Sequence, residues 1–285
     1  MSAAFSAHFS QRSQARGCTF VIDSIDANDS PLFKDDHAVI ARLRTACGVL
    51  RSLRIYYGSR RRRVAMDRLY AAFVRPGDLV FDVGAHVGDR VAAFRRLGAR
   101  VVAVEPQPAL VATLRLLFGR DPNVAIEAVA LGRKPGTVTL KLNLDNPTVS
   151  TASEAFIRAA DGAPGWLGQT WARDIDVPMT TFDQLIARHG VPVFAKIDVE
   201  GYEAETLAGL TRPLAALSFE FTMIQRDIAA ECLARCGALG ASRFNVALGE
   251  SQSFVHADWV SAAEIGAWLA DLPAEANSGD IYALA

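Results

Sequence analysis

The stretch VFDVGAHVGD, residues 80–89, places an acid and two glycines where an apolar run gives way to a helix-forming segment. Gly84 can adopt backbone angles that are closed to other residues, and Gly88 lets the following helix approach closely. In open parallel sheets ligands bind beyond the carboxyl ends of the strands, so this turn indicates a cofactor site. Glu105 ends the next apolar run, VVAVE, about 20 residues after Asp82. An acid at this offset can accept hydrogen bonds from the ribose hydroxyls of an adenosine.

Two adenosine cofactors compete for this turn. A dinucleotide requires the pattern GxGxxG, whose backbone cradles the pyrophosphate at the helix N-terminus. The turn reads GAHVG and lacks the middle glycine. Asp82 would repel a diphosphate, whereas an acid suits a cofactor that carries an amino group and a sulfonium. The turn therefore favours S-adenosylmethionine over a nicotinamide dinucleotide. In the alternative interpretation, the glycines serve only helix packing and Glu105 is a surface acid.

A second polar group lies in FAKIDVEGYEAETLAGL, residues 194–210. Alternation along a strand places Lys196 and Asp198 on the same face, with Asp198 at the carboxyl end beside the expected cleft. Glu200 follows at the start of the next helix. These carboxylates could orient the methyl donor or take a proton from an attacking hydroxyl. The alternative is a buried Asp–Lys pair that only neutralises itself.

Two further residues are candidates for proton transfer. His86 lies within the glycine turn, and histidine is the usual base near neutral pH. Glu220, in the apolar run LSFEF, needs either a partner or a catalytic role, because burying a charge alone is costly. The alternatives are a loop histidine that only bonds to backbone and a structural ion pair at Glu220.

The sequence fixes no metal site. Three acids near one cleft could nevertheless hold a divalent cation that binds a diol acceptor. Cys232 and Cys236 lie one helical turn apart, which favours buried free thiols over metal ligands. The basic run Arg60 to Arg63 is interpreted either as a solvated face or as an anchor for an anionic partner, such as a substrate phosphate or a membrane surface.

These residues require an alternating series of strands and helices, which predicts an α/β fold with a mainly parallel sheet covered on both faces. The expected strands are Leu79–Val83, Arg100–Glu105, Val124–Val129, Thr137–Asn143, Val193–Asp198, Leu217–Phe221, Arg243–Ala247 and Asp280–Leu284, the last two as an antiparallel hairpin. The expected helices are Asp89–Leu97, Pro108–Phe118, Thr181–Arg188, Gly201–Gly209 and Ile224–Cys236, with two or three more between Asp35 and Val74.

Domain organisation follows from breaks in this pattern. Residues 1–30 show no sustained periodicity, and a Pro-Gly breaker at 76–77 separates a helical extension, residues 1–75, from the main domain, residues 76–285. The interval from Leu144 to Ile175 is long for a connector, so we interpret it as a lid or substrate loop, with a disordered surface excursion as the alternative.

The segments FDVGAHVGD, VVAVEPQP, NVAIEAVALGRKPGTVTL, TTFDQLI, AKIDVEGYEAETLAGL and LSFEFT, in this order, resemble the FkbM-type family of S-adenosylmethionine-dependent methyltransferases. The resemblance runs from about Val74 to Phe221 and more faintly to the C-terminal GDIYALA. It implies a Rossmann-like class I methyltransferase sheet of seven strands, the last inserted antiparallel. It also implies methyl transfer to a hydroxyl oxygen on a sugar or natural-product scaffold.

The resemblance assigns site residues by position. The methionine end would be lined by Asp82, Gly84, His86 and Gly88, although family members often have Asn at position 86. Glu105, with the adjacent Pro106, would contact the ribose, and Asp198 would lie near the methyl group. The catalytic candidates are Asp198, Glu200, Glu220 and His86.

Composition limits the partners. The chain of 285 residues is 51% hydrophobic with a net charge of −1, which argues against nucleic acid as a main partner. No apolar stretch approaches the roughly 18 residues of a membrane span, and no secretory signal is recognisable, so we expect a cytoplasmic protein. The expected partner is a small-molecule acceptor with a hydroxyl group.

Three functions are therefore considered. An S-adenosylmethionine-dependent O-methyltransferase acting on a sugar or polyketide-like acceptor is favoured. The alternatives are an NAD-dependent oxidoreductase and a non-catalytic scaffold that retains the cofactor fold, because fold alone does not specify function.

Overall fold

The computed structural model describes residues 31–285, with side chains described from residue 39 onward. The predictions for residues 1–30, and for Cys18 among them, lie outside the described residues. Residues 39–285 form one compact unit. The predicted boundary between residues 75 and 76 stays a prediction.

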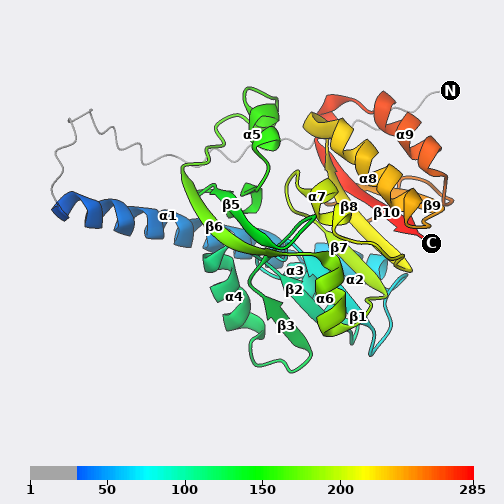
Figure 1. Ribbon diagram of the computed structural model, residues 1–285, viewed down its shortest axis with the longest axis horizontal. Coiled ribbons are helices and arrows are strands. Elements are labelled where there is room, and N and C mark those ends of the chain that lie inside the picture. The colour runs from blue at the N-terminus through cyan, green and yellow to red at the C-terminus, as the bar shows by residue number, and fades with distance from the viewer. Residues whose placement is uncertain (1–30) are drawn as a thin grey trace. The chain divides into compact units, whose positions relative to one another are not determined.

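The main sheet has seven strands in the order β3, β2, β1, β7, β8, β10 and β9, with β3 and β9 at its edges (Figure 1). All neighbouring strands are parallel except β10, which runs antiparallel to both β8 and β9. The strand bounds are Val124–Glu127 (β3), Arg100–Val104 (β2), Leu79–Val83 (β1), Phe194–Ile197 (β7), Ala216–Thr222 (β8), Ser278–Leu284 (β10) and Arg243–Leu248 (β9). The predicted α/β class with an antiparallel last strand is confirmed.

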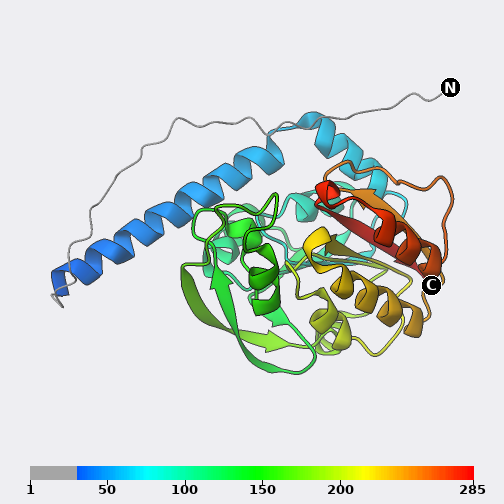
Figure 2. The ribbon, with the colours of Figure 1, turned by 90° about the horizontal axis from the view of Figure 1, so that it is seen from above.

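Helices cover both faces of this sheet. Successive residues of a strand point in opposite directions, so each strand packs against helices on both sides. In β1, Phe81 and Val83 pack in a buried cluster with α6, α7, α8 and α9, whereas Val80 packs in a second cluster with α2, α3 and α4. Figure 2 shows α8 and α9 side by side. The helix bounds are Pro31–Tyr57 (α1), Arg60–Tyr70 (α2), Asp89–Arg96 (α3), Pro108–Phe118 (α4), Glu154–Ala160 (α5), Phe182–His189 (α6), Glu203–Ala208 (α7), Arg226–Ala238 (α8) and Ala262–Asp271 (α9).

A second, smaller sheet contains a strand that we expected in the main, mostly parallel sheet. β5 (Gly136–Leu142) pairs antiparallel with β6 (Arg173–Thr180), and β4 (Ala130–Leu131) pairs parallel with β6. The prediction of a strand near Thr137 is thus right, but this strand pairs outside the main sheet. Its partner β6 was not predicted; its first three residues, Arg173 to Ile175, fell at the end of the interval interpreted as a loop.

The interval from Leu144 to Ile175 is folded. It holds a 3-10 helix, η1 (Pro147–Val149), and α5, and Val149, Phe156 and Trp166 form a small buried cluster. The interpretation as a disordered excursion is therefore wrong. Two further 3-10 helices, η2 (Met223–Gln225) and η3 (Ala274–Ala276), precede α8 and β10. Within residues 31–285, no helix has the length and apolarity needed to cross a bilayer.

Candidate active site

A pocket of about 1100 Å³, partly open to solvent, lies at the carboxyl ends of β1, β2, β7 and β8. The strand order reverses between β1 and β7, which is where open α/β sheets bind their ligands. The predicted site residues in its wall are Gly84, His86, Glu105, Pro106, Asp198, Glu200 and Glu220. Asp82 and Gly88 do not line the pocket; their predicted contacts with the cofactor stay predictions.

The turn after β1 depends on its first glycine. Gly84 has a φ of +82°, in the left-handed region that favours glycine. A Cβ atom at Gly84 would lie 1.7 Å from the carbonyl oxygen of Asp198. The absent side chain therefore lets the turn pass directly against the end of β7.

Gly88 serves a different contact. It is the N-cap residue of α3 with a φ of +79°, and a Cβ atom there would lie 2.5 Å from the Phe118 ring. The glycine thus permits close packing between the start of α3 and α4. This agrees with the expected helix approach.

Glu105 is buried at the end of β2 and is held by the backbone. Its Oε2 accepts a hydrogen bond of 2.9 Å from the His86 amide, and its Oε1 accepts one of 2.8 Å from the Gln107 amide. Burial raises the pKa of Glu105 to about 7, although the two backbone hydrogen bonds act to lower it. Each carboxyl oxygen keeps a second lone pair for a ligand in the pocket.

Asp82 lies on the face of β1 opposite Phe81, in register with Lys196 of β7. It is fully buried, and neither carboxyl oxygen has a hydrogen-bond partner among the described residues. Burial raises its pKa to about 7, against the opposing charge of Arg90. Such an unpaired acid is costly to the fold.

Lys196 and Asp198, which were expected on the same face, form the ion pair considered as the alternative, and Asp280 joins it. Lys196, with 0% exposure, lies 3.2 Å from Asp198 Oδ2 and 2.6 Å from Asp280 Oδ1. Burial acts to raise the pKa of Asp198, but Lys196 and Arg90 outweigh it and lower this pKa to about 2. The Asp198 side chain keeps 23% of its surface exposed. It is therefore an ionised carboxylate whose charge is balanced by Lys196 and which is still open to the pocket.

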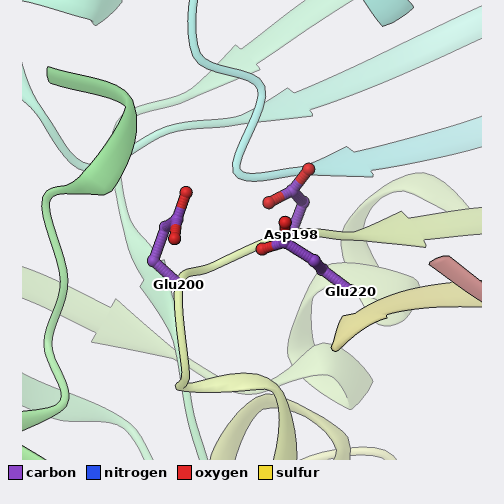
Figure 3. A group of neighbouring side chains, drawn as sticks. All are labelled: Asp198, Glu200 and Glu220. Atoms are coloured by element: carbon purple, nitrogen blue, oxygen red, sulfur yellow. The ribbon is translucent and has the colours of Figure 1, made fainter. Parts of the chain in front are cut away.

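Two more carboxyl groups lie beside Asp198. Figure 3 shows Glu220 of β8 reaching toward Asp198, with Glu200 on the turn that follows β7. One oxygen from each residue lies within 4.8 Å of the others. Burial, with the nearby Asp198 charge, raises the pKa of Glu200 and of Glu220 well above the ordinary value.

His86 is neutral near physiological pH. Burial lowers its pKa to about 4. Its Nε2 lies 3.3 Å from the Thr148 hydroxyl, and its ring meets the Tyr56 ring edge-on. A neutral imidazole is able to accept a proton, and His86 faces the pocket.

Several pocket residues were missed by the sequence reasoning: Tyr56, Arg90, Thr148, Glu250 and Asp280. Only Thr148 lies in a segment that we had interpreted as a substrate loop. Tyr56 and Arg90 lie in predicted helices and Asp280 in a predicted strand, whereas Glu250 lies beyond the strand predicted at Arg243–Ala247. No local pattern marks them.

The four arginines of residues 60–63 have different surroundings in the structure. Arg62 forms ion pairs with Asp89 at 3.2 Å and Glu250 at 2.8 Å, and its guanidinium lies 4.4 Å from the centre of the Tyr56 ring. The exposed members are Arg60, Arg61 and Arg63. Arg62 therefore supports the pocket wall. An anionic partner for the other three stays a prediction.

Cys232 and Cys236 are free and buried on α8, as expected. Burial raises the pKa of both thiols, with Cys236 at about 12. They pack with Leu233 in the larger core cluster. Both thiols are therefore part of the core.

Three solved structures are similar to this chain at low identity. The TehB-like S-adenosylmethionine-dependent methyltransferase of Corynebacterium glutamicum is 11% identical over 90% of this chain and 99% of that one, with a TM-score of 0.41. The 1,6-didemethyltoxoflavin-N1-methyltransferase of Burkholderia thailandensis is 15% identical over 91% and 92%, with a TM-score of 0.37. Aeropyrum pernix fibrillarin, with natively bound S-adenosylmethionine, is 13% identical over 74% and 68%, with a TM-score of 0.39.

No curated protein matches the sequence. The family model described as the methyltransferase FkbM domain matches residues 82–272. This match confirms the resemblance and extends it beyond Phe221, through α8 and α9. The protein thus belongs to the FkbM family of methyltransferases, and its methyl donor is S-adenosylmethionine.

Proposed function

We propose that the protein methylates a hydroxyl oxygen of a sugar or natural-product acceptor. The observation that carries this proposal is that Glu105 and the three carboxyl groups of Asp198, Glu200 and Glu220 line the same pocket. Carboxyl oxygens accept hydrogen bonds from hydroxyl groups, so such a wall suits an acceptor that presents several hydroxyls.

The residues fit the methyl donor in their chemistry. Glu105 is fixed by two backbone amides and would accept hydrogen bonds from ribose hydroxyls, with Pro106 beside it. Asp198, which is ionised because of Lys196, would bind the donor's ammonium group. The donor supplies an electrophilic methyl group when bound.

The remaining residues would act on the acceptor. Positioning an acceptor hydroxyl against the donor is expected to supply most of the rate acceleration. A general base must be unprotonated at working pH, and among the four catalytic candidates Asp198 and His86 meet this condition, with pKa values of about 2 and 4. Both are weak bases, which agrees with a reaction governed by orientation.

Substrate choice would come from the elements around the pocket mouth. Tyr56 of α1, together with Thr148 and Ser150 near η1, lines the pocket on the side of the interval interpreted as a substrate loop. A cytoplasmic location is the expected one. The family match favours this reaction class over the NAD-dependent oxidoreductase.

The first test is calorimetric titration with S-adenosylhomocysteine. We expect the intact protein to bind it and Glu105→Ala to bind at least about tenfold more weakly, because two charge-assisted hydrogen bonds of about 1.5–3 kcal/mol each are lost. Glu127→Ala, which removes an acid paired with His189 outside the pocket, is the control and should bind normally.

The acceptor is then sought by incubating the protein with labelled methyl donor and a panel of sugars, nucleotide-linked sugars and polyketide alcohols. Methylation of a hydroxyl compound supports the proposal. Normal cofactor binding with labelling only at nitrogen or carbon atoms would overturn the O-methylation, and labelling of no compound would favour the non-catalytic scaffold.

A further inference from the structure

We propose that Asp198, Glu200 and Glu220 together bind one divalent cation of the Mg²⁺, Mn²⁺ or Ca²⁺ type. The site lies in the wall of the methyltransferase pocket, and its role in the reaction rests on the function proposed above. Hard cations of this class prefer carboxylate oxygens as ligands.

The geometry suits a single ion. One oxygen from each of the three residues lies within 4.8 Å of the other two (Figure 3). Opposite ligands lie about 4.0–4.2 Å apart across Mg²⁺ and about 4.6–5.2 Å apart across Ca²⁺, since these are twice the metal–oxygen distances. One cation can therefore contact all three side chains with little rearrangement.

The second observation is that Glu200 lacks a partner and that Glu220, which meets Asp198, leaves one carboxyl oxygen unpaired. Glu200 is 7% exposed and faces the pocket, yet its carboxyl group has no hydrogen bond or ion pair with any residue between 39 and 285. Glu220 Oε2 is also buried and without a hydrogen-bond partner in that part of the chain. Burying polar oxygens in this way is costly, so the arrangement indicates a ligand.

The nearby positive charges do not fill this need. Lys196 is engaged by Asp198 and Asp280, and Arg90 lies 3.9 Å from Asp198 and 3.6 Å from Glu250. Neither cation forms an ion pair with Glu200 or Glu220 within the described residues. Residues 39–285 therefore supply no cationic partner for Glu200 or Glu220.

The turn that carries Glu200 is held in place from both sides. The Thr151 hydroxyl donates a hydrogen bond of 2.6 Å to the Glu200 carbonyl oxygen. The Val199 amide donates one of 2.9 Å to Glu203 Oε1, which keeps Glu203 out of the group. These contacts position the Glu200 side chain beside Asp198 and Glu220.

A cation at this place would leave coordination positions for substrate oxygens, because three protein ligands fill only half of an octahedral shell. An acceptor hydroxyl that binds the ion becomes more acidic. This would assist an acceptor whose remaining candidate base, His86, is weak.

The test is calorimetric titration of the EDTA-treated and dialysed full chain with Mn²⁺ alone. We expect one ion per chain. Glu220→Gln and Glu200→Gln should each weaken binding at least about tenfold, since even outer-shell partners of a metal are worth about 10- to 100-fold in affinity. Glu205→Gln is the matched control, because it removes the same charge from an exposed acid of α7 that pairs with Arg133, and its Mn²⁺ affinity should stay unchanged.

Titration with S-adenosylhomocysteine in EDTA separates this proposal from the proposed function and shows that each variant is folded. Cofactor binding by a wild-type chain that binds no Mn²⁺ would overturn the cation site and leave the function standing. Mn²⁺ binding that all three variants weaken equally would also overturn it. A third outcome is a chain that binds no cofactor but binds Mn²⁺, with affinity weakened only by Glu200→Gln and Glu220→Gln. This outcome would support the cation site and count against the proposed function.

Discussion

Glu105 and Asp82 are both buried acids at the start of the pocket, yet their surroundings differ. Glu105 receives two backbone hydrogen bonds, whereas Asp82 receives none from the described residues. Burial is costly for both carboxyl groups, but only Glu105 is compensated by backbone hydrogen bonds. The effect of Asp82 can be measured through the dependence of the protein's stability on pH.

Asp82 should make the stability of the ligand-free protein depend on pH. Burial raises its pKa from 3.8 to about 7, so the folded chain holds this proton more tightly than the unfolded chain. The contribution is fully present below about pH 4 and is lost as the pH rises to about 7. We expect the melting temperature of the wild type to fall more between pH 5 and pH 8 than that of Asp82→Asn.

Thermal unfolding of both proteins in EDTA at a series of pH values checks this. Glu203, whose pKa burial also raises to about 7, is common to both proteins and cancels in the comparison. Parallel curves for the two proteins would show that Asp82 does not titrate in this window.

At the scale of elements, the site depends on close contact between the turn after β1 and the end of β7. The Asp198 amide donates a hydrogen bond of 2.9 Å to the Val83 carbonyl, and Gly84 passes against the Asp198 carbonyl. The turn that lines the pocket and the strand that leads to Asp198 are thus held together by backbone atoms. A side chain added at Gly84 should therefore disturb both the turn after β1 and the end of β7.

Gly84→Ala should destabilise the protein by about 2–5 kcal/mol. The left-handed conformation costs about 1–2 kcal/mol for an alanine, and forcing an atom into a packed site adds about 1–3 kcal/mol. The matched control is Gly77→Ala, because Gly77 has a φ of +88° but no atom within 4 Å of its Cβ position, so only the conformational cost applies. Denaturant titration measures both, and equal losses would show that the contact with Asp198 relaxes freely.

At the scale of the whole molecule, the helices before the first strand take part in the main core. Met66, Leu69 and Tyr70 of α2 lie in the buried cluster that contains Phe194 and Tyr282 of the sheet. Arg62 of the same helix pairs with Glu250 near the pocket. The methyltransferase core therefore includes residues outside the range 82–272 that the family model matches.

We expect a chain that begins at residue 76 to lose cooperative thermal unfolding. Removing buried large side chains costs about 2–5 kcal/mol each, and a whole domain is stable by only about 5–15 kcal/mol. A chain that begins at residue 39, the start of the compact unit, should unfold cooperatively. A folded, cofactor-binding chain of residues 76–285 would instead support the predicted boundary at residue 75.

The sequence by itself determined the fold class, the glycine turn after the first strand, the acid after the second strand and the shared face of Lys196 and Asp198. These are local patterns: alternation within a strand, a glycine where a turn needs one, and an acid at a fixed distance along the chain. Only the tertiary structure decided that Asp280 joins Lys196, that Glu220 meets Asp198 and Glu200, that Arg62 supports the pocket, and that β5 pairs outside the main sheet. Such contacts depend on strand order and register across long stretches of chain, which the spacing of residues within a single segment does not encode.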